Sequence, residues 1–109
     1  MTIYHKQMAN GDWQKYSLVE QMANIGSEVF RTISWRKKDA KLSSQAFERA
    51  LELIDLTIAD PKNKKRLKEI CRVRECLVDY FAGKNEYKSS DEFWQKYFYN
   101  FNYAARINY

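Results

Sequence analysis

Three acids on one predicted helix suggest metal chemistry. Glu48, Glu52 and Asp55 recur at positions i, i+4 and i+7, a spacing that places all three carboxylates on one helix face. Carboxylates inside a helical bundle can hold Mg²⁺ or a di-iron pair. Di-iron sites of that kind also need Glu-x-x-His on two helices, and the only histidine of the chain is His5. The sequence therefore argues against a di-iron protein.

A magnesium site stays open as an alternative. All-α nucleotide pyrophosphohydrolases combine a Glu-x-x-Glu element with a later Glu-x-x-Asp element. The stretch Glu52-Leu53-Ile54-Asp55 matches the second element, whereas Glu20 and Glu28 stand too far apart to form the first. We therefore expect no metal site and no cofactor. A magnesium-dependent nucleotide hydrolase using Glu48, Glu52 and Asp55 is the third-ranked function.

One arginine interrupts an apolar row. Arg74 falls between Ile70 and Val78 on a predicted helix, and a guanidinium keeps its charge even when it is buried. A buried charge needs an opposite charge beside it. We therefore expect a buried ion pair between Arg74 and at least one acid of a neighbouring helix. The candidate partners are Asp55, Glu52 and Glu28.

The net charge of +5 comes largely from two basic clusters, one around residues 36–41 and the other at residues 62–68. Basic clusters contact phosphates in nucleic-acid-binding proteins. An RNA- or DNA-binding bundle is the second-ranked function. Its phosphate contacts would be Lys37, Lys38, Lys64, Lys65 and Arg66. In an up-and-down bundle the two clusters lie at opposite ends, which favours solvated helix ends instead.

Aromatic residues are concentrated near the C-terminus, where the last seventeen residues hold eight of the seventeen. Trp94 and Phe98 fall within one apolar arc, and Tyr99 and Tyr103 lie on the opposite side of the same helix. The tyrosine face is then a surface covered by the N-terminal arm, an interface between copies, or a stacking surface for nucleic acid. We expect an interface made by Trp94, Phe98, Tyr99 and Tyr103.

Apolar periodicity and the scarcity of glycine and proline predict an all-α fold. The expected helices run from Trp13 to about Lys37, from Ser43 or Ser44 to about Asp60, from Pro61 to Ala82, and from a capping box of Ser89 and Glu92 to about Ile107. Gly26 suggests a close approach of two helices, and Gly83 a left-handed helix end. Residues 1–12 form an N-terminal arm, and residues 13–109 form one antiparallel up-and-down four-helix bundle.

The two cysteines and the hydropathy indicate a location. Cys71 and Cys76 stand five residues apart on a predicted helix and cannot bridge. The chain has no run of about 18 apolar residues and no signal-peptide pattern at its start. We therefore expect a cytoplasmic protein that does not enter a membrane.

Three segments carry a family resemblance: residues 24–29, 49–60 and 74–81. They resemble a family of small prokaryotic all-α proteins, with similarity from about Tyr16 to Arg106. The resemblance implies a free-standing one-domain protein and no particular activity. More loosely, the size and plan are similar to the HEPN group and to four-helix proteins encoded in ribosomal-RNA intervening sequences. Many HEPN proteins are RNases with Arg-x4–6-His, and no arginine here precedes a histidine at that spacing.

The residues favour a binding function over catalysis. A serine or cysteine nucleophile has no base near it in the sequence, so catalysis is unsupported. The first expectation is a non-enzymatic interaction or scaffold protein that forms a homodimer or another homo-oligomer.

Overall fold

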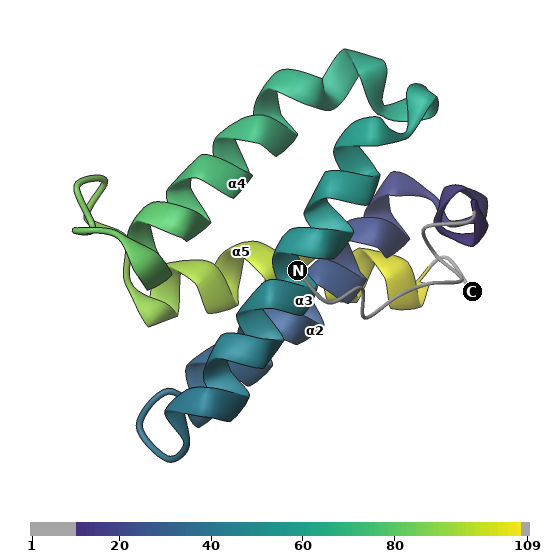
Figure 1. Ribbon diagram of the computed structural model, residues 1–109. Coiled ribbons are helices and arrows are strands. Elements are labelled where there is room, and N and C mark those ends of the chain that lie inside the picture. The colour runs from purple at the N-terminus through teal and green to yellow at the C-terminus, as the bar shows by residue number, and fades with distance from the viewer. Residues whose placement is uncertain (1–10, 108–109) are drawn as a thin grey trace.

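The chain forms an all-α four-helix bundle, as the periodicity predicts. The computed structural model describes residues 11–107, so the predicted N-terminal arm lies almost wholly outside the described residues. The elements in order are η1 (Asp12–Lys15), α2 (Leu18–Trp35), α3 (Ala40–Ala59), η2 (Pro61–Arg66), α4 (Leu67–Ala82) and α5 (Asp91–Ile107), shown in Figure 1. The described part of the chain contains no β-strand.

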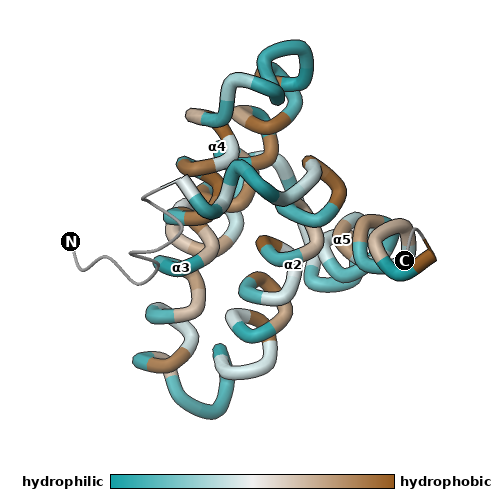
Figure 2. The backbone as a smooth tube through the Cα atoms, turned by 90° about the vertical axis from the view of Figure 1, so that its right-hand side faces the viewer, coloured by the Kyte–Doolittle hydropathy of each residue, from teal (hydrophilic) through white to brown (hydrophobic). Residues whose placement is uncertain are grey.

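Helix α2 is the centre of the bundle. It packs against α3 on one side and against α5 on the other. Helices α3 and α4 meet at η2 and diverge from there, so that α4 runs towards the start of α5, which crosses behind α2 and α3 (Figure 1). The view turned by 90° shows α5 beside α2, on the side away from α3 (Figure 2). The bundle is therefore open between α3 and α4, which diverge from η2.

The core follows the helical period of the sequence. Each helix buries apolar residues spaced three or four apart, which is the stripe that a helix presents to its neighbours. The buried apolar residues are Met22, Ile25 and Val29 of α2, Ala46, Ala50, Leu53 and Ile54 of α3, Ile70, Val73 and Leu77 of α4, and Trp94 and Phe98 of α5, with Trp13 of η1.

The close helix approach expected at Gly26 is confirmed, and its partner is α5. A Cβ atom added at Gly26 would lie 2.7 Å from Cβ of Phe98, whereas packed carbon atoms stay about 3.5–4.0 Å apart. Because the clash involves the first carbon of the Phe98 side chain, a change of rotamer cannot relieve it. Gly26 therefore sets the distance at which α5 crosses α2.

Helices α2, α3 and α4 begin at other residues than expected, and α4 starts at Leu67 because Pro61–Arg66 form the separate 3-10 helix η2. Helix α2 starts after Ser17, whose Oγ accepts from the Glu20 amide at 3.2 Å while the Glu20 carboxylate accepts from the Ser17 amide at 3.0 Å. This capping box separates α2 from η1, since Tyr16 between them is extended. Helix α3 starts at Ala40, because the Asp39 carboxylate accepts from the amides of Lys41 and Leu42.

The connection between α4 and α5 also differs from expectation. Gly83 is extended, and the left-handed residues are Asn85 and Lys88. The Asp79 carboxylate holds the loop by accepting from the amides of Glu86 and Tyr87 at 2.8 and 3.0 Å. The predicted capping box of Ser89 and Glu92 is wrong, because Ser90 is the residue whose Oγ accepts from the Phe93 amide, at 3.1 Å.

Candidate functional site

Arg74 pairs with Asp55, but the pair lies at the surface. Nε of Arg74 is 2.7 Å from Oδ1 of Asp55, and the two side chains are 38% and 56% exposed. The expectation of burial is wrong because Ile70, Val73 and Leu77 form the buried row of α4 and Arg74 stands at its edge. An exposed pair of this kind contributes about 0–1 kcal/mol to stability.

Glu28, another expected partner of Arg74, forms ion pairs with two other arginines. Its carboxylate is largely buried on α2 and lies 2.6 Å from Nη1 of Arg31 and 3.0 Å from Nε of Arg49 on α3. The buried ion cluster of this bundle therefore joins α2 to α3 and does not include Arg74. Glu52 is half-buried on α3, and the acid that pairs with Arg74 is Asp55.

The magnesium alternative has no geometric support in residues 11–107. Within that range, no three histidine, cysteine, aspartate or glutamate side chains lie close enough together to hold a metal ion. Glu48, Glu52 and Asp55 share a helix, and Asp55 turns towards Arg74. Carboxylates from one helix alone do not surround an ion.

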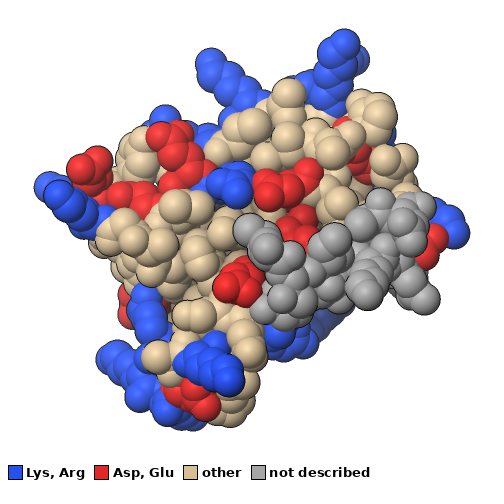
Figure 3. Space-filling view, viewed as in Figure 1, with Lys and Arg blue, Asp and Glu red and all other residues tan. Residues whose placement is uncertain are grey.

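The two basic clusters lie at opposite ends of the bundle, as expected. Lys37 and Lys38 follow the end of α2, whereas Lys64, Lys65 and Arg66 lie in η2 (Figure 1). Basic and acidic side chains are interspersed over the face shown in Figure 3. The five lysines and arginines therefore do not form one phosphate-binding patch.

The expected interface residues of α5 divide between the core and the surface. Trp94 and Phe98 are fully buried, so they contact α2 and α4 and are not available to a second copy. Tyr99 and Tyr103 are 59% and 56% exposed, and their rings stack with centroids 6.5 Å apart. One turn further on, Ile107 is 62% exposed. We call Tyr99, Tyr103 and Ile107 the outer face of α5.

A groove between α4 and α5 was not predicted. It encloses about 390 Å³ and is mostly apolar, with one acidic and one basic residue in its lining. The lining residues are Glu69, Arg72, Val73 and Cys76 of α4, Tyr87 and Ser89 of the loop, and Phe93, Trp94 and Tyr97 of α5. The groove exists because α4 diverges from its neighbours, which the periodicity of α4 alone does not indicate.

Polar contacts order the edge of this groove. The Arg72 guanidinium stacks over the Tyr87 ring at 4.9 Å, and the Tyr87 hydroxyl donates to Glu75 at 2.7 Å. The Tyr97 hydroxyl lies 3.5 Å from Glu69. Burial, followed by the negative charge of Glu69, raises the pKa of Tyr97 to about 12. Tyr97 therefore stays protonated at neutral pH and presents a neutral ring to the groove.

A buried polar network joins four elements at the η2 end of the bundle. The Gln21 amide donates to the Trp13 carbonyl at 3.0 Å and to Asp60 at 2.9 Å, and it accepts from Asn63 at 2.8 Å. Thr57 accepts from the Trp13 indole at 2.9 Å. All five residues are buried. Because these hydrogen bonds link each element to the next, the network fixes the positions of η1, α2, α3 and η2 relative to one another.

Asp60 makes the stability of this corner depend on pH. Burial would raise the pKa of its carboxyl, but hydrogen bonds from Lys62 and Gln21 outweigh burial and lower the pKa below 3.8. A lowered folded-state pKa stabilises the fold above the unfolded-state value, and this stabilisation is lost as the pH falls through the folded-state value. We expect Asp60→Asn to lower the urea midpoint at pH 7 and to reduce the midpoint's acid dependence below about pH 4. Parallel curves for both proteins would contradict this assignment.

No similarity to a known protein indicates the function of these surfaces. Neither protein-family models, nor curated proteins, nor solved structures match this chain. No helix in the described range is both long and apolar enough to cross a membrane. Two surfaces therefore offer contacts to a partner. One is the outer face of α5, and the other is the α4–α5 groove together with the basic residues at its edge, which we call its basic border.

Proposed function

We propose that this protein is a non-enzymatic helical scaffold that self-associates through the outer face of α5. The supporting observation is the row Tyr99, Tyr103 and Ile107, whose large side chains stay exposed at intervals of four residues. Side chains four apart form a continuous stripe on a helix. Tyrosine and isoleucine stripes of this kind suit burial against another protein surface.

The spacing suits a symmetric pair. Helix α5 has 17 residues and is therefore about 25 Å long. If two copies of α5 pack antiparallel around an axis near Tyr103, Tyr99 of each copy meets Ile107 of the other. A two-fold interface requires this kind of self-complementary pattern. A helix face alone is smaller than a stable interface of about 800 Å² per partner, so we expect micromolar association.

The cysteines suit a reducing compartment. Cys71 is exposed and Cys76 is half-buried, and both are free thiols. Free exposed thiols persist in the cytoplasm and oxidise outside it. We infer that the scaffold works in the cytoplasm, as its resemblance to small prokaryotic helical proteins also suggests.

The test is a concentration series in sedimentation velocity. The unaltered protein should shift from monomer to dimer over tens of micromolar, because its stripe is buried in the pair. The double variant Tyr99→Lys with Tyr103→Lys should remain monomeric at every concentration, since two lysines on each side would repel one another.

The matched control replaces an exposed aromatic residue elsewhere. Trp35 lies at the end of α2 and is 40% exposed, so Trp35→Lys should leave dimer formation unchanged. An unaltered protein that remains monomeric throughout the series would refute self-association. Equal losses in both variants would mean that the outer face of α5 is not the interface.

A further inference from the structure

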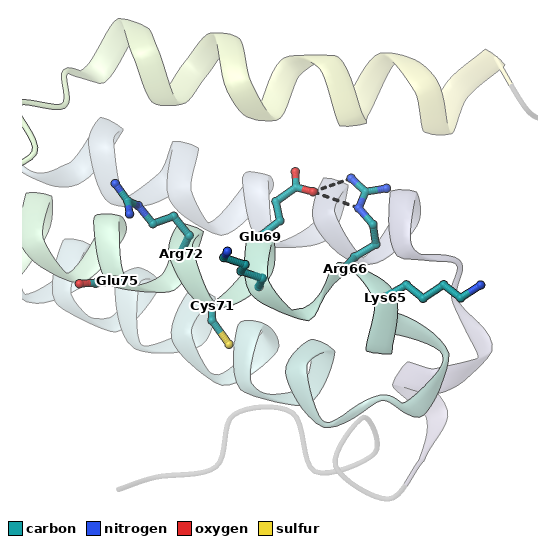
Figure 4. Close-up of a pocket in the computed structure, with 7 residues that line it drawn as sticks. Lys65, Arg66, Glu69, Cys71, Arg72 and Glu75 are labelled. Atoms are coloured by element: carbon teal, nitrogen blue, oxygen red, sulfur yellow. Dashed lines mark hydrogen bonds and ion pairs between the residues drawn. The ribbon is translucent and has the colours of Figure 1, made fainter.

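The basic border of the groove forms a second surface next to it. A shallow hollow runs along the exposed side of η2 and α4, where it is lined by Lys65, Arg66, Lys68, Glu69, Cys71, Arg72 and Glu75. Glu69 and Arg72 also line the α4–α5 groove. Figure 4 shows Arg66 of η2 and Glu69 and Arg72 of α4 on the side of these elements that faces α5. The basic hollow and the aromatic groove are therefore continuous.

Basic residues are concentrated in the segment that forms this surface. Residues 61–74 contain seven lysines and arginines and one acid. Three of the seven pair with acids: Lys62 with Asp60, Arg66 with Glu69, and Arg74 with Asp55. The other four, Lys64, Lys65, Lys68 and Arg72, form no ion pair with any acid of residues 11–107. Their charge is available to an anionic partner.

The two acids on this surface already have partners. Glu69 accepts from Arg66 through two nitrogens, at 3.0 and 2.6 Å. Glu75 accepts from the Tyr87 hydroxyl. The charge of Glu69 is offset by Arg66, so Glu75 is the one acid of the hollow whose charge a polyanion approaching Lys65, Lys68 and Arg72 would still meet.

Flat aromatic faces lie beside these cations. Phe93 is 53% exposed, and its ring stacks with Tyr97 at a centroid distance of 6.3 Å and an interplanar angle of 20°. Tyr87 is also exposed, and one face of its ring carries Arg72. Exposed aromatic rings such as Phe93 and Tyr87, next to unpaired cations, are the arrangement that single-stranded nucleic-acid binders use for bases and phosphates.

We propose that the α4–α5 groove and its basic border bind single-stranded nucleic acid. Bases stack on the exposed rings of Phe93 and Tyr87, while Lys65, Lys68 and Arg72 contact the phosphates. A duplex is a poorer partner because its bases already stack within the helix and cannot reach the groove. The site lies on the flank of α5 away from Tyr99 and Tyr103, so it does not depend on self-association.

The test is fluorescence anisotropy with short labelled oligo-uridine and oligo-thymidine. We expect one or both to bind at about 50 mM salt, with a log–log salt slope of about −2 for three phosphate contacts. The tighter of the two identifies RNA or DNA as the partner. Phe93→Ala should weaken binding about fivefold or more, because it removes one stacking face. A circular dichroism melt of each variant confirms that it folds.

A pair of double variants separates this site from general attraction by net charge. Lys65→Glu with Lys68→Glu should weaken binding at least about tenfold. Lys37→Glu with Lys38→Glu makes the same charge change at the opposite end of the bundle and should have little effect. The proposal fails if neither oligonucleotide binds, if both double variants lose affinity equally, or if a duplex of matched length binds as tightly as the single strand.

Discussion

Replacing Phe98 with alanine is expected to lower the free energy of unfolding by about 3–5 kcal/mol. The Phe98 ring is fully buried against Gly26 of α2, and it stacks on Trp94 with centroids 5.9 Å apart. Removing it leaves a cavity that the backbone cannot fill, because Gly26 already brings α2 as close to α5 as the two helices can pack. Urea unfolding followed by circular dichroism at low protein concentration measures the loss.

The neighbouring residue provides the matched control. Tyr99 follows Phe98 on the same helix and is mostly exposed, so Tyr99→Ala should change the free energy of unfolding by no more than about 0.5 kcal/mol. The measurement is made at a concentration well below that of the proposed dimer formation, so an interface role of Tyr99 would not affect it. Equal destabilisation by the two variants would show that α5 presents a different face to the core.

The second large effect is expected at Gln21. Gln21→Leu keeps the approximate size of the side chain but removes three hydrogen bonds, to Trp13, Asp60 and Asn63. Breaking a buried polar network leaves its remaining members poorly satisfied, so we expect a loss of about 3 kcal/mol. Proteolysis should also become faster at the η1 and η2 segments, since the network holds both against the bundle.

Asn24 is the control for that substitution. It lies on the same helix and carries the same kind of amide group, but it is exposed and bonds only the Glu20 carbonyl of its own helix. Asn24→Leu should therefore leave the free energy of unfolding within about 0.5 kcal/mol of the original. If Gln21→Leu has an equally small effect, the network does not stabilise the corner.

The two proposed surfaces lie on different sides of α5. The outer face carries Tyr99 and Tyr103, whereas the flank towards α4 carries Phe93 and Tyr97. A dimer formed through the outer face would present two grooves on one particle. Linking two binding sites raises the effective concentration at the second site. Such a scaffold would therefore hold a single strand at two places.

The sequence by itself determined the helices and one of their contacts. Apolar residues spaced three or four apart specify a helix wherever they occur, because the period is a property of the backbone. Asp60 and Pro61 mark the end of α3 and the start of η2, and Asp60 accepts from the Lys62 amide there. Gly26 indicated a close approach because a helix tolerates glycine at a cost that packing must offset.

Only the tertiary structure decided which flank of each helix meets which neighbour. Arg74 lies on an apolar row of the sequence, yet the divergence of α4 places it at the surface beside Asp55. Trp13, Gln21 and Asn63 are unremarkable in sequence, and their network forms only when η1 and η2 meet across α2. The physical reason is that the period fixes angles around one helix axis, whereas contacts depend on how the axes cross. That crossing is set by side-chain volumes from distant parts of the chain.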